Sequence, residues 1–321
     1  MVIEDSTGDV ALDAVFETVD DAGAPVAARI DAALAHLATV RSDPEQHVVA
    51  GSVLAGSLRP ELDALRSRVR AVRTGPEAAE LRGLLCGALV SAAWEIRGGG
   101  WAKNVAPDVW DPFRKLMEEA DEVGYAALEL VPDHAHAGCA RMMTGLGLGL
   151  PQQEWWHRFK VARRSRPTLY PAHWFMLSAL CAKWYGSDEL MWEFGRATAG
   201  QAPPGDPVTA MLALAHYEHL ISLKRQELPS REAARIWTGR IRSDLPELTA
   251  AADRWLQGPA VAHPRDFEAH QLFGFVFHAG DEDDLARRHL ERGTLRPALV
   301  PWRDAEHFAE TLSELKVLPV T

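Results

Sequence analysis

The stretch that decides the fold is Ala127-Leu-Glu-Leu-Val-Pro132, which is followed 35 residues later by Ala162-Arg-Arg-Ser-Arg-Pro167. The same spacing of 35 separates Ala137 from Ala172, and Ala162 from Ala197. A small alanine lets two helices approach closely, and a proline ends the second helix before a new hairpin begins. A repeat of this length is typical of helical hairpins that stack on one another. The sequence therefore predicts a solenoid of antiparallel helical hairpins.

Helix-favouring composition extends beyond this repeat. Period-2 alternation is scarce, and the segments between breakers such as Gly98-Gly99-Gly100 and Pro203-Pro204-Gly205 are rich in Ala, Leu, Arg and Glu, which favour helix. We therefore predict an all-α protein. The predicted helices cover residues 26–40, 60–73, 76–97, 108–130, 134–147, 152–165, 169–183, 187–199, 206–224, 230–256, 266–278 and 282–293.

The predicted domain organisation has four parts. They are an acidic, flexible N-terminus (1–25), an N-terminal helical region (26–107), the tetratricopeptide-like repeats (108–205) and a C-terminal helical region (206–321). Because the predicted connections are short, we expect residues 26–321 to form one continuous domain.

Two resemblances support the helical architecture. Ala127-Leu-Glu-Leu-x-Pro132 and Phe159-x-x-Ala162-x-x-x-x-Pro167 resemble the second helix and exit turn of tetratricopeptide repeats, over about residues 108–200, without that family's full Trp-Leu-Gly-Tyr pattern. Over about residues 90–220 the chain also resembles a group of uncharacterised actinobacterial proteins. The motifs that carry this second resemblance are Ala92-Ala-Trp94-Glu-x-Arg97-Gly, Lys183-Trp-Tyr-Gly186-Ser187, Phe194-x-Arg196-Ala and Ala215-His216-x-Glu218. It implies the same architecture but no activity, cofactor or catalytic residue.

The charge balance restricts the partners. The 34 Lys and Arg residues and 45 Asp and Glu residues give a net charge of −11, which disfavours a general role in binding nucleic acid. No apolar run reaches the roughly 18 residues that span a bilayer, and the acidic start is unlike a signal peptide. We expect a cytoplasmic protein without a membrane partner. Its three cysteines lack metal or disulfide spacing and are interpreted as buried thiols.

The clearest local anomaly lies between Glu154 and Asp188, where this acidic chain has no Asp or Glu and instead alternates basic and aromatic residues. Helical spacing places Trp155, Phe159 and Ala162 toward the core and leaves the basic residues on another face. The predicted binding residues on and beside this stretch are Lys160, Arg163, Arg164, Arg166, Tyr170, His173, Lys183, Trp184 and Arg196.

The leading functional hypothesis is an interaction protein that binds an acidic peptide or protein partner through this surface, around residues 155–196. Single-stranded nucleic acid stacked on the aromatic residues is a less favoured alternative. A third interpretation is a solvated helix whose cations pair with acids of the same chain. In a fourth, the acidic residues 1–31 of one subunit meet the basic stretch of another, so that the protein self-associates.

An alternative of a different class is an enzyme or small-molecule-binding protein with a pocket between helices. Its candidate residues are Trp94, Glu95, Arg97, His173, His216 and Glu218. The chain lacks a nucleophile elbow and a phosphate loop, so we expect no catalytic residues and no cofactor. An enzyme is therefore the less favoured of the two classes.

Metal binding was considered because histidines recur in Asp133-His134-Ala-His136, in Glu154-x-x-His157 and in His216-x-x-His219. Di-iron bundles need two Glu-x-x-His motifs, and the chain has only one. The spacing supplies no third ligand for His216 and His219, which lie on one face of a predicted helix. The sequence therefore predicts no metal site.

Overall fold

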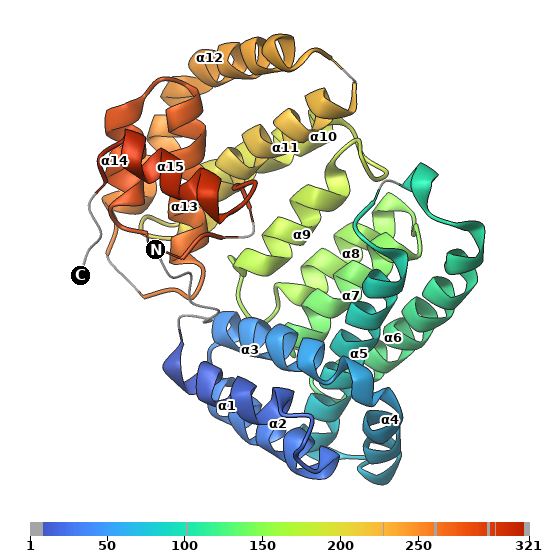
Figure 1. Ribbon diagram of the computed structural model, residues 1–321. Coiled ribbons are helices and arrows are strands. Elements are labelled where there is room, and N and C mark those ends of the chain that lie inside the picture. Colours follow the sequence, from blue (N-terminus) through green and yellow to red (C-terminus); the bar gives the residue numbers. More distant parts are fainter. Residues whose placement is uncertain are drawn as a thin grey trace. The chain divides into compact units, whose positions relative to one another are not determined.

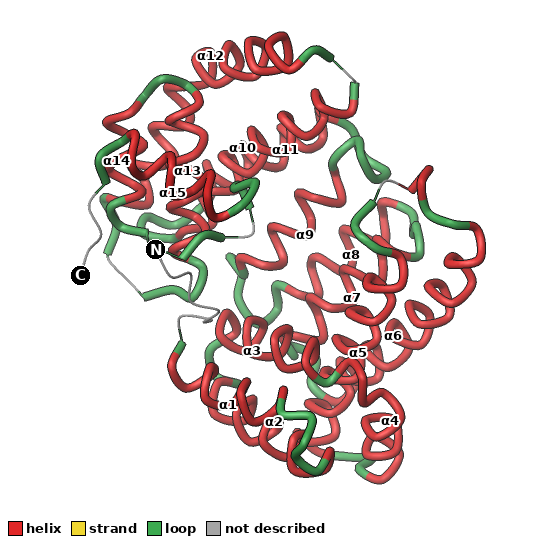
Figure 2. The backbone as a smooth tube through the Cα atoms, viewed as in Figure 1, coloured by secondary structure: helices red, strands yellow, loops and turns green. Residues whose placement is uncertain are grey.

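The computed structural model describes residues 9–100, 102–226, 228–259, 262–293, 296–298 and 300–317. Within these ranges the regular structure consists of fifteen α-helices and a few short 3-10 turns, with no strand (Figure 2). The prediction of an all-α protein is confirmed. None of the described helices combines the length and apolar character needed to cross a membrane.

The described residues divide into two compact units, one ending at Met176 and the other beginning at Leu177. The boundary falls inside helix α9 (Tyr170–Leu180) and within the segment 108–205 that the sequence marks as repeats.

The first unit is built around α5, which has thirteen buried residues. Helix α5 packs against α3, α4, α6 and α7, and α7 in turn packs against α8 (Figure 1). Its buried residues are mainly Leu and Ala, which allow neighbouring helices to lie close. The helices of this unit are α1 (Val10–Asp20), α2 (Val26–Val40), α3 (Pro44–Ser57), α4 (Leu62–Ala71), α5 (Gly75–Arg97), α6 (Trp110–Leu130), α7 (Ala135–Gly147), α8 (Gln152–Ala162) and the start of α9.

The second unit is organised around α11, which packs against α10, α12 and α13, while α14 packs against α13 (Figure 1). Helix α11 buries nine of its fifteen residues, so it forms the centre of this unit's core. The helices are α10 (Asp188–Gln201), α11 (Met211–Arg225), α12 (Ser230–Leu256), α13 (Asp266–Ala279), α14 (Asp283–Leu290) and α15 (Ala305–Glu314).

All twelve predicted helices are present, with ends shifted by a few residues. The sequence reading missed α1, α3 and α15. Helix α1 lies within the segment predicted to be flexible, yet Asp9 caps it by accepting from two backbone N–H groups, and its Leu12 and Val19 are buried. Helix α3 contains Gly51 and Gly56, which lower helix propensity. For this reason the sequence pattern did not predict a helix there.

The 35-residue repeat is only partly reflected in packing. Ala127 and Ala162 are 0% and 2% exposed. A Cβ added to Gly138 would lie 2.9 Å from the Cα of Ala162, so α7 and α8 are in close contact at this glycine. Ala197, the third member of the series, is exposed on α10. The prediction of a close helix contact at Ala197 was therefore wrong. Its neighbour Gly195 makes the contact instead, facing Ala215 of α11.

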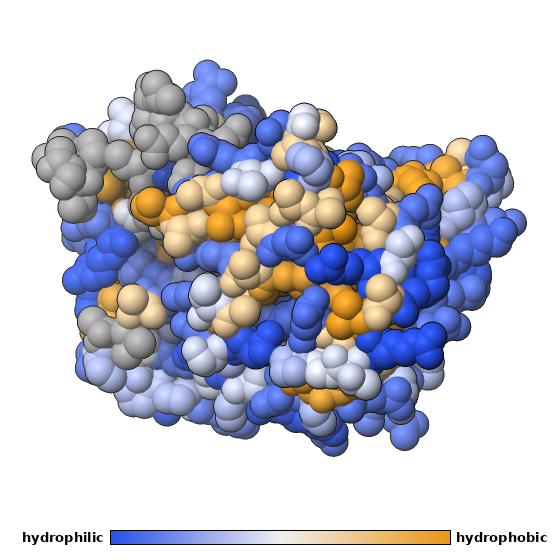
Figure 3. Space-filling view, turned by 90° about the horizontal axis from the view of Figure 1, so that it is seen from below, coloured by the Kyte–Doolittle hydropathy of each residue, from blue (hydrophilic) through white to orange (hydrophobic). Residues whose placement is uncertain are grey.

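One side of the first unit exposes an apolar band interrupted by charged residues (Figure 3). Much of the exposed apolar surface of α1 and α2 comes from alanines, whose small side chains bury little area when covered. The exposed residues of this kind are Ala11, Ala14, Ala27, Ala28, Ala35 and Ala38, next to Val10, which is 85% exposed.

Candidate functional site

The orientation predicted for α8 is confirmed. Trp155 and Phe159 are each 3% exposed and pack into the core of the first unit. Trp156, Lys160 and Arg164 are exposed instead. These three residues follow one another at intervals of four, about one helical turn, with Arg164 in the turn directly after the helix. The outer face of α8 therefore presents an aromatic ring and two cations together.

Two further arginines border this face but are engaged within the chain. Arg163 donates its Nε–H to the carbonyl of Pro167, and its guanidinium lies 4.9 Å from the centre of the Phe159 ring. Burial lowers the pKa of Arg163. Arg166 donates to Thr168 Oγ1 and lies 3.7 Å from the carboxylate of Glu45. Both side chains are only partly exposed, so they contribute less to a binding surface than Lys160 and Arg164.

Tyr170 and His173 are located in the core rather than on this surface. They are 1% and 5% exposed. The Tyr170 N–H donates to Glu45 Oε1 at 2.9 Å, and the His173 ring meets the edge of Phe159. Burial prevents either side chain from supplying the contact area that the sequence-based hypothesis assigned to it.

Arg158 also belongs to the acid-free stretch, yet it is 4% exposed and paired with Asp121 of α6. Arg141 and Thr144 of α7 contact the same carboxylate at 3.1 and 2.7 Å. Burial opposes ionisation of Asp121, but Arg158 and Arg141 outweigh it and lower its pKa to about 2. This network holds α6, α7 and α8 together. The network could not be predicted from local spacing, because its carboxylate lies 37 positions before Arg158.

The remaining predicted binding residues belong to the second unit. Lys183 forms an ion pair of 2.6 Å with Glu218, which is 6% exposed. Trp184 is partly exposed next to it in sequence. The ion pair joins one residue of the predicted binding surface to one residue of the predicted alternative pocket, a pairing that the sequence reading did not make.

Arg196 and His216 share a carboxylate in the same unit. Asp244 of α12 lies 3.2 Å from Arg196 and 3.6 Å from His216. Burial, followed by the nearby charges of Arg240, His219 and Arg196, lowers the pKa of His216 to about 3. His216 is 0% exposed and therefore neutral near pH 7, which suits a packed core residue better than a proton-transfer group.

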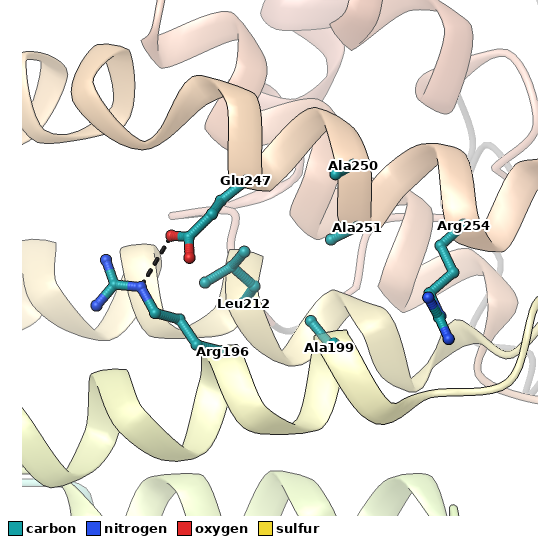
Figure 4. A pocket seen from close by; sticks show the side chains of 8 residues that line it. Arg196, Ala199, Leu212, Glu247, Ala250, Ala251 and Arg254 are labelled. Carbon is teal, nitrogen blue, oxygen red and sulfur yellow. Dashed lines mark hydrogen bonds and ion pairs between the residues drawn. The ribbon is translucent and has the colours of Figure 1, made fainter.

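A shallow groove of about 170 Å³ lies beside Arg196. Figure 4 shows Arg196 and Glu247, joined by an ion pair of 2.8 Å, at one end and Arg254 at the other. Ala199, Ala250, Ala251 and Leu212 lie between them, and Gly200 completes the lining. The groove combines an apolar floor with two arginines.

Trp94, Glu95 and Arg97 of the predicted alternative pocket form a cluster at the surface of the first unit, directly before the glycines at 98–100. The Arg97 guanidinium lies over Trp94 and Trp110, 5.2 and 5.8 Å from the ring centres. It also donates to the carbonyls of Gly98 and Gly100. Glu95 is exposed and pairs with Arg59 at 2.8 Å. Arg97 thus shapes the exit of α5, and Gly98, with a φ of +72°, permits the turn.

A cluster of polar side chains around Glu80 is buried elsewhere in the first unit and was not predicted from the sequence. Glu80 of α5 accepts from Arg41 at 2.7 Å and lies 2.9 Å from His47 and 3.2 Å from His134. Burial raises the pKa of Glu80, but the two histidines outweigh burial and hold it well below its usual range. The sequence reading noted His134 but had no means of placing Glu80 or His47 next to it.

No protein-family model, curated protein or solved structure shows a significant match to this chain.

Proposed function

We propose that the protein is a helical-repeat interaction protein that binds an acidic segment of a partner along the outer face of α8. The observation that carries this proposal is the row of Trp156, Lys160 and Arg164, exposed one turn apart in a stretch without acidic residues. An exposed tryptophan, 38% accessible here, supplies apolar contact area. The cations one and two turns after this ring favour a peptide that carries carboxylates.

The stacked-hairpin interpretation is part of this proposal. It is supported by the sequential packing of α5, α6, α7 and α8 and by the small residues Gly138 and Ala162 where α7 meets α8. Stacked hairpins offer a rigid, extended surface, and rigid surfaces lose little entropy when a flexible segment binds to them.

A defined acidic probe tests the proposal. The probe is a fluorescein-labelled peptide with glutamates on both sides of a central phenylalanine, and binding is followed by fluorescence anisotropy at low salt. We expect the double variant Lys160→Glu, Arg164→Glu to weaken binding by about tenfold or more, which corresponds to about 1.4 kcal/mol. Trp156→Ala should weaken binding without changing its salt dependence, because the ring contributes contact area rather than charge.

The matched control is Arg70→Glu, Arg73→Glu, which changes the net charge equally at two exposed positions of the same unit. It should leave the affinity close to that of the unaltered protein. Equal weakening by both double variants would show that only the overall charge matters, and the placement on α8 would then be wrong.

A second candidate function, small-molecule binding, is favoured by the groove beside Arg196. Arg254 at one end of an apolar floor suits a small apolar ligand with a single carboxylate, because Arg196 at the other end is already paired with Glu247. The volume of about 170 Å³ is below the roughly 300 Å³ at which typical ligand pockets begin, so this function ranks second. Thermal-shift measurements with butyrate should show a stabilisation that Arg254→Ala removes; no shift in the unaltered protein would exclude this ligand class.

A further inference from the structure

Three potential metal ligands from three helices meet inside the first unit. His47 projects from α3, Glu80 from α5, and His134 stands directly before α7. One donor atom from each lies within 4.8 Å of the others. The two histidine Nε2 atoms lie 2.9 and 3.2 Å from Glu80 Oε2.

The site is enclosed and shaped for imidazole rings. The three side chains are each 2% exposed. A Cβ placed on Gly83 would lie 2.8 Å from the His134 ring. A Cβ on Gly51 or Gly87 would lie 2.4 or 2.9 Å from the ring of His136, which is the next histidine along the chain. Glycines therefore leave the space that the rings occupy.

We propose that His47, Glu80 and His134 form a binding site for a divalent transition-metal ion, with zinc as the best fit. Zinc binds imidazole nitrogen and carboxylate oxygen at about 2.0–2.2 Å, which places neighbouring ligand atoms of a tetrahedral site about 3.3 Å apart. The observed separations of 2.9 and 3.2 Å are close to that value. Two histidines and one glutamate also form a ligand set that leaves a fourth position for another molecule.

The surroundings of the carboxylate are compatible with this assignment. Arg41 donates to Oε1 of Glu80, which orients the carboxylate and leaves Oε2 facing the histidines, as outer-shell partners do in metal sites. Without metal, His47 donates a hydrogen bond from its Nε2 proton to the same Oε2, and the proton of His134 is also on Nε2, because its Nδ1 accepts from the Ala137 N–H. Metal binding replaces those protons and releases them, so the affinity for zinc should fall as the pH is lowered.

One contact must open when the metal binds. The Ala137 N–H donates to Nδ1 of His134 at 3.2 Å, whereas an imidazole bound to metal through Nε2 carries its proton on Nδ1. The amide resonance of Ala137 should therefore shift on zinc binding, although Ala137 is not a ligand.

The test is equilibrium dialysis of the full, untagged chain against zinc, with the metal content measured by mass spectrometry. We expect one zinc per chain. His134→Asn removes the ligand atom but keeps a good helix cap, and Glu80→Gln keeps the shape of the carboxylate. Each should weaken zinc binding by about a hundredfold. The exposed-histidine variant His157→Ala is the control and should bind as the unaltered protein does.

Two results would overturn the proposal. The first is an unaltered protein that retains much less than one zinc. The second is a folded His134→Asn variant, verified by circular dichroism, that retains zinc with unchanged affinity. If Glu80→Gln does not fold, cobalt titration of the unaltered protein decides the question, because ligation by His47 and His134 must produce the visible absorption bands of tetrahedral cobalt and their absence contradicts the site.

Discussion

The contacts of individual residues explain why two similar arginines in the acid-free stretch have different roles. Arg158 and Arg164 are six positions apart in one basic run, yet the first is buried against Asp121 and the second is exposed. Helical period alone predicts that they lie on different faces. It cannot show which face meets a carboxylate, because Asp121 comes from another helix.

The Asp121 network makes a pH-dependent contribution to stability. The folded pKa of about 2 lies below the ordinary value of about 3.9. The stabilisation is therefore complete above about pH 4 and is lost as the pH falls toward 2. Asp121→Asn should cost about 2 kcal/mol or more near pH 7, because it also leaves Arg158 buried without its carboxylate.

Urea unfolding at several pH values checks this prediction. The difference between Asp121→Asn and the unaltered protein should shrink between about pH 4 and pH 2. The variant Asp20→Asn, at an exposed position of α1, is the control. A difference that does not change with pH would contradict the assigned role of Asp121.

Two glycine variants on α3 test whether the space beside the His136 ring is needed for stability. Gly51→Ala places a methyl group 2.4 Å from that ring, whereas a Cβ on Gly56 meets nothing within 4 Å. Gly51→Ala should therefore destabilise the protein by about 2 kcal/mol, and Gly56→Ala should be neutral or stabilising by up to about 1 kcal/mol. Thermal unfolding measures both, and a similar loss in the two variants would contradict the recess.

At the scale of elements, helix positions were predictable and side-to-side packing was not. Breakers and composition locate twelve helices, because caps, prolines and glycines act locally along the chain. The inward stripe of Trp155 and Phe159 also follows from local periodicity. The convergence of His47, Glu80 and His134 depends on which helices are neighbours, and residue spacing within one helix carries no information on that.

The uneven repeat leads to a prediction about α8 and α10. Ala162→Leu should destabilise the protein by about 2 kcal/mol, because the added atoms meet Gly138 across a close helix contact. Ala197→Leu, on the exposed face of α10, should change stability by less than about 0.5 kcal/mol. Denaturant unfolding of the two variants compares them directly. Equal losses of stability in the two variants would show that Ala162 and Ala197 occupy equivalent positions in a regular 35-residue repeat.

For the whole molecule, the acidic N-terminal region is relevant to self-association. Several of its acids are already used within the chain: Asp9 caps α1, Asp21 accepts from Gly23, and Asp31 pairs with Arg68 at 2.8 Å. The ion pair with Arg68 offsets the charge of Asp31, and the backbone hydrogen bonds hold the carboxylates of Asp9 and Asp21 against their own chain, so these acids are less able to bind the basic stretch of a second copy. The molecular mass measured by light scattering should therefore be the same at low and high salt. A mass that falls as salt is added would instead support pairing between the acidic and basic regions of two copies.

The glycine recesses have a consequence for how the helices of the first unit find their alignment. Contact faces made of leucine and alanine can often pack almost as well after a slip of one turn, about 5.4 Å. The His136 ring resists that slip, because it occupies the space that Gly51 of α3 and Gly87 of α5 leave for it, and Ala55 stands one turn after Gly51 on α3. His136 therefore sets the axial register of α7 against α3 and α5, and the packing of these helices depends on the spaces that glycines leave as much as on the side chains that fill them.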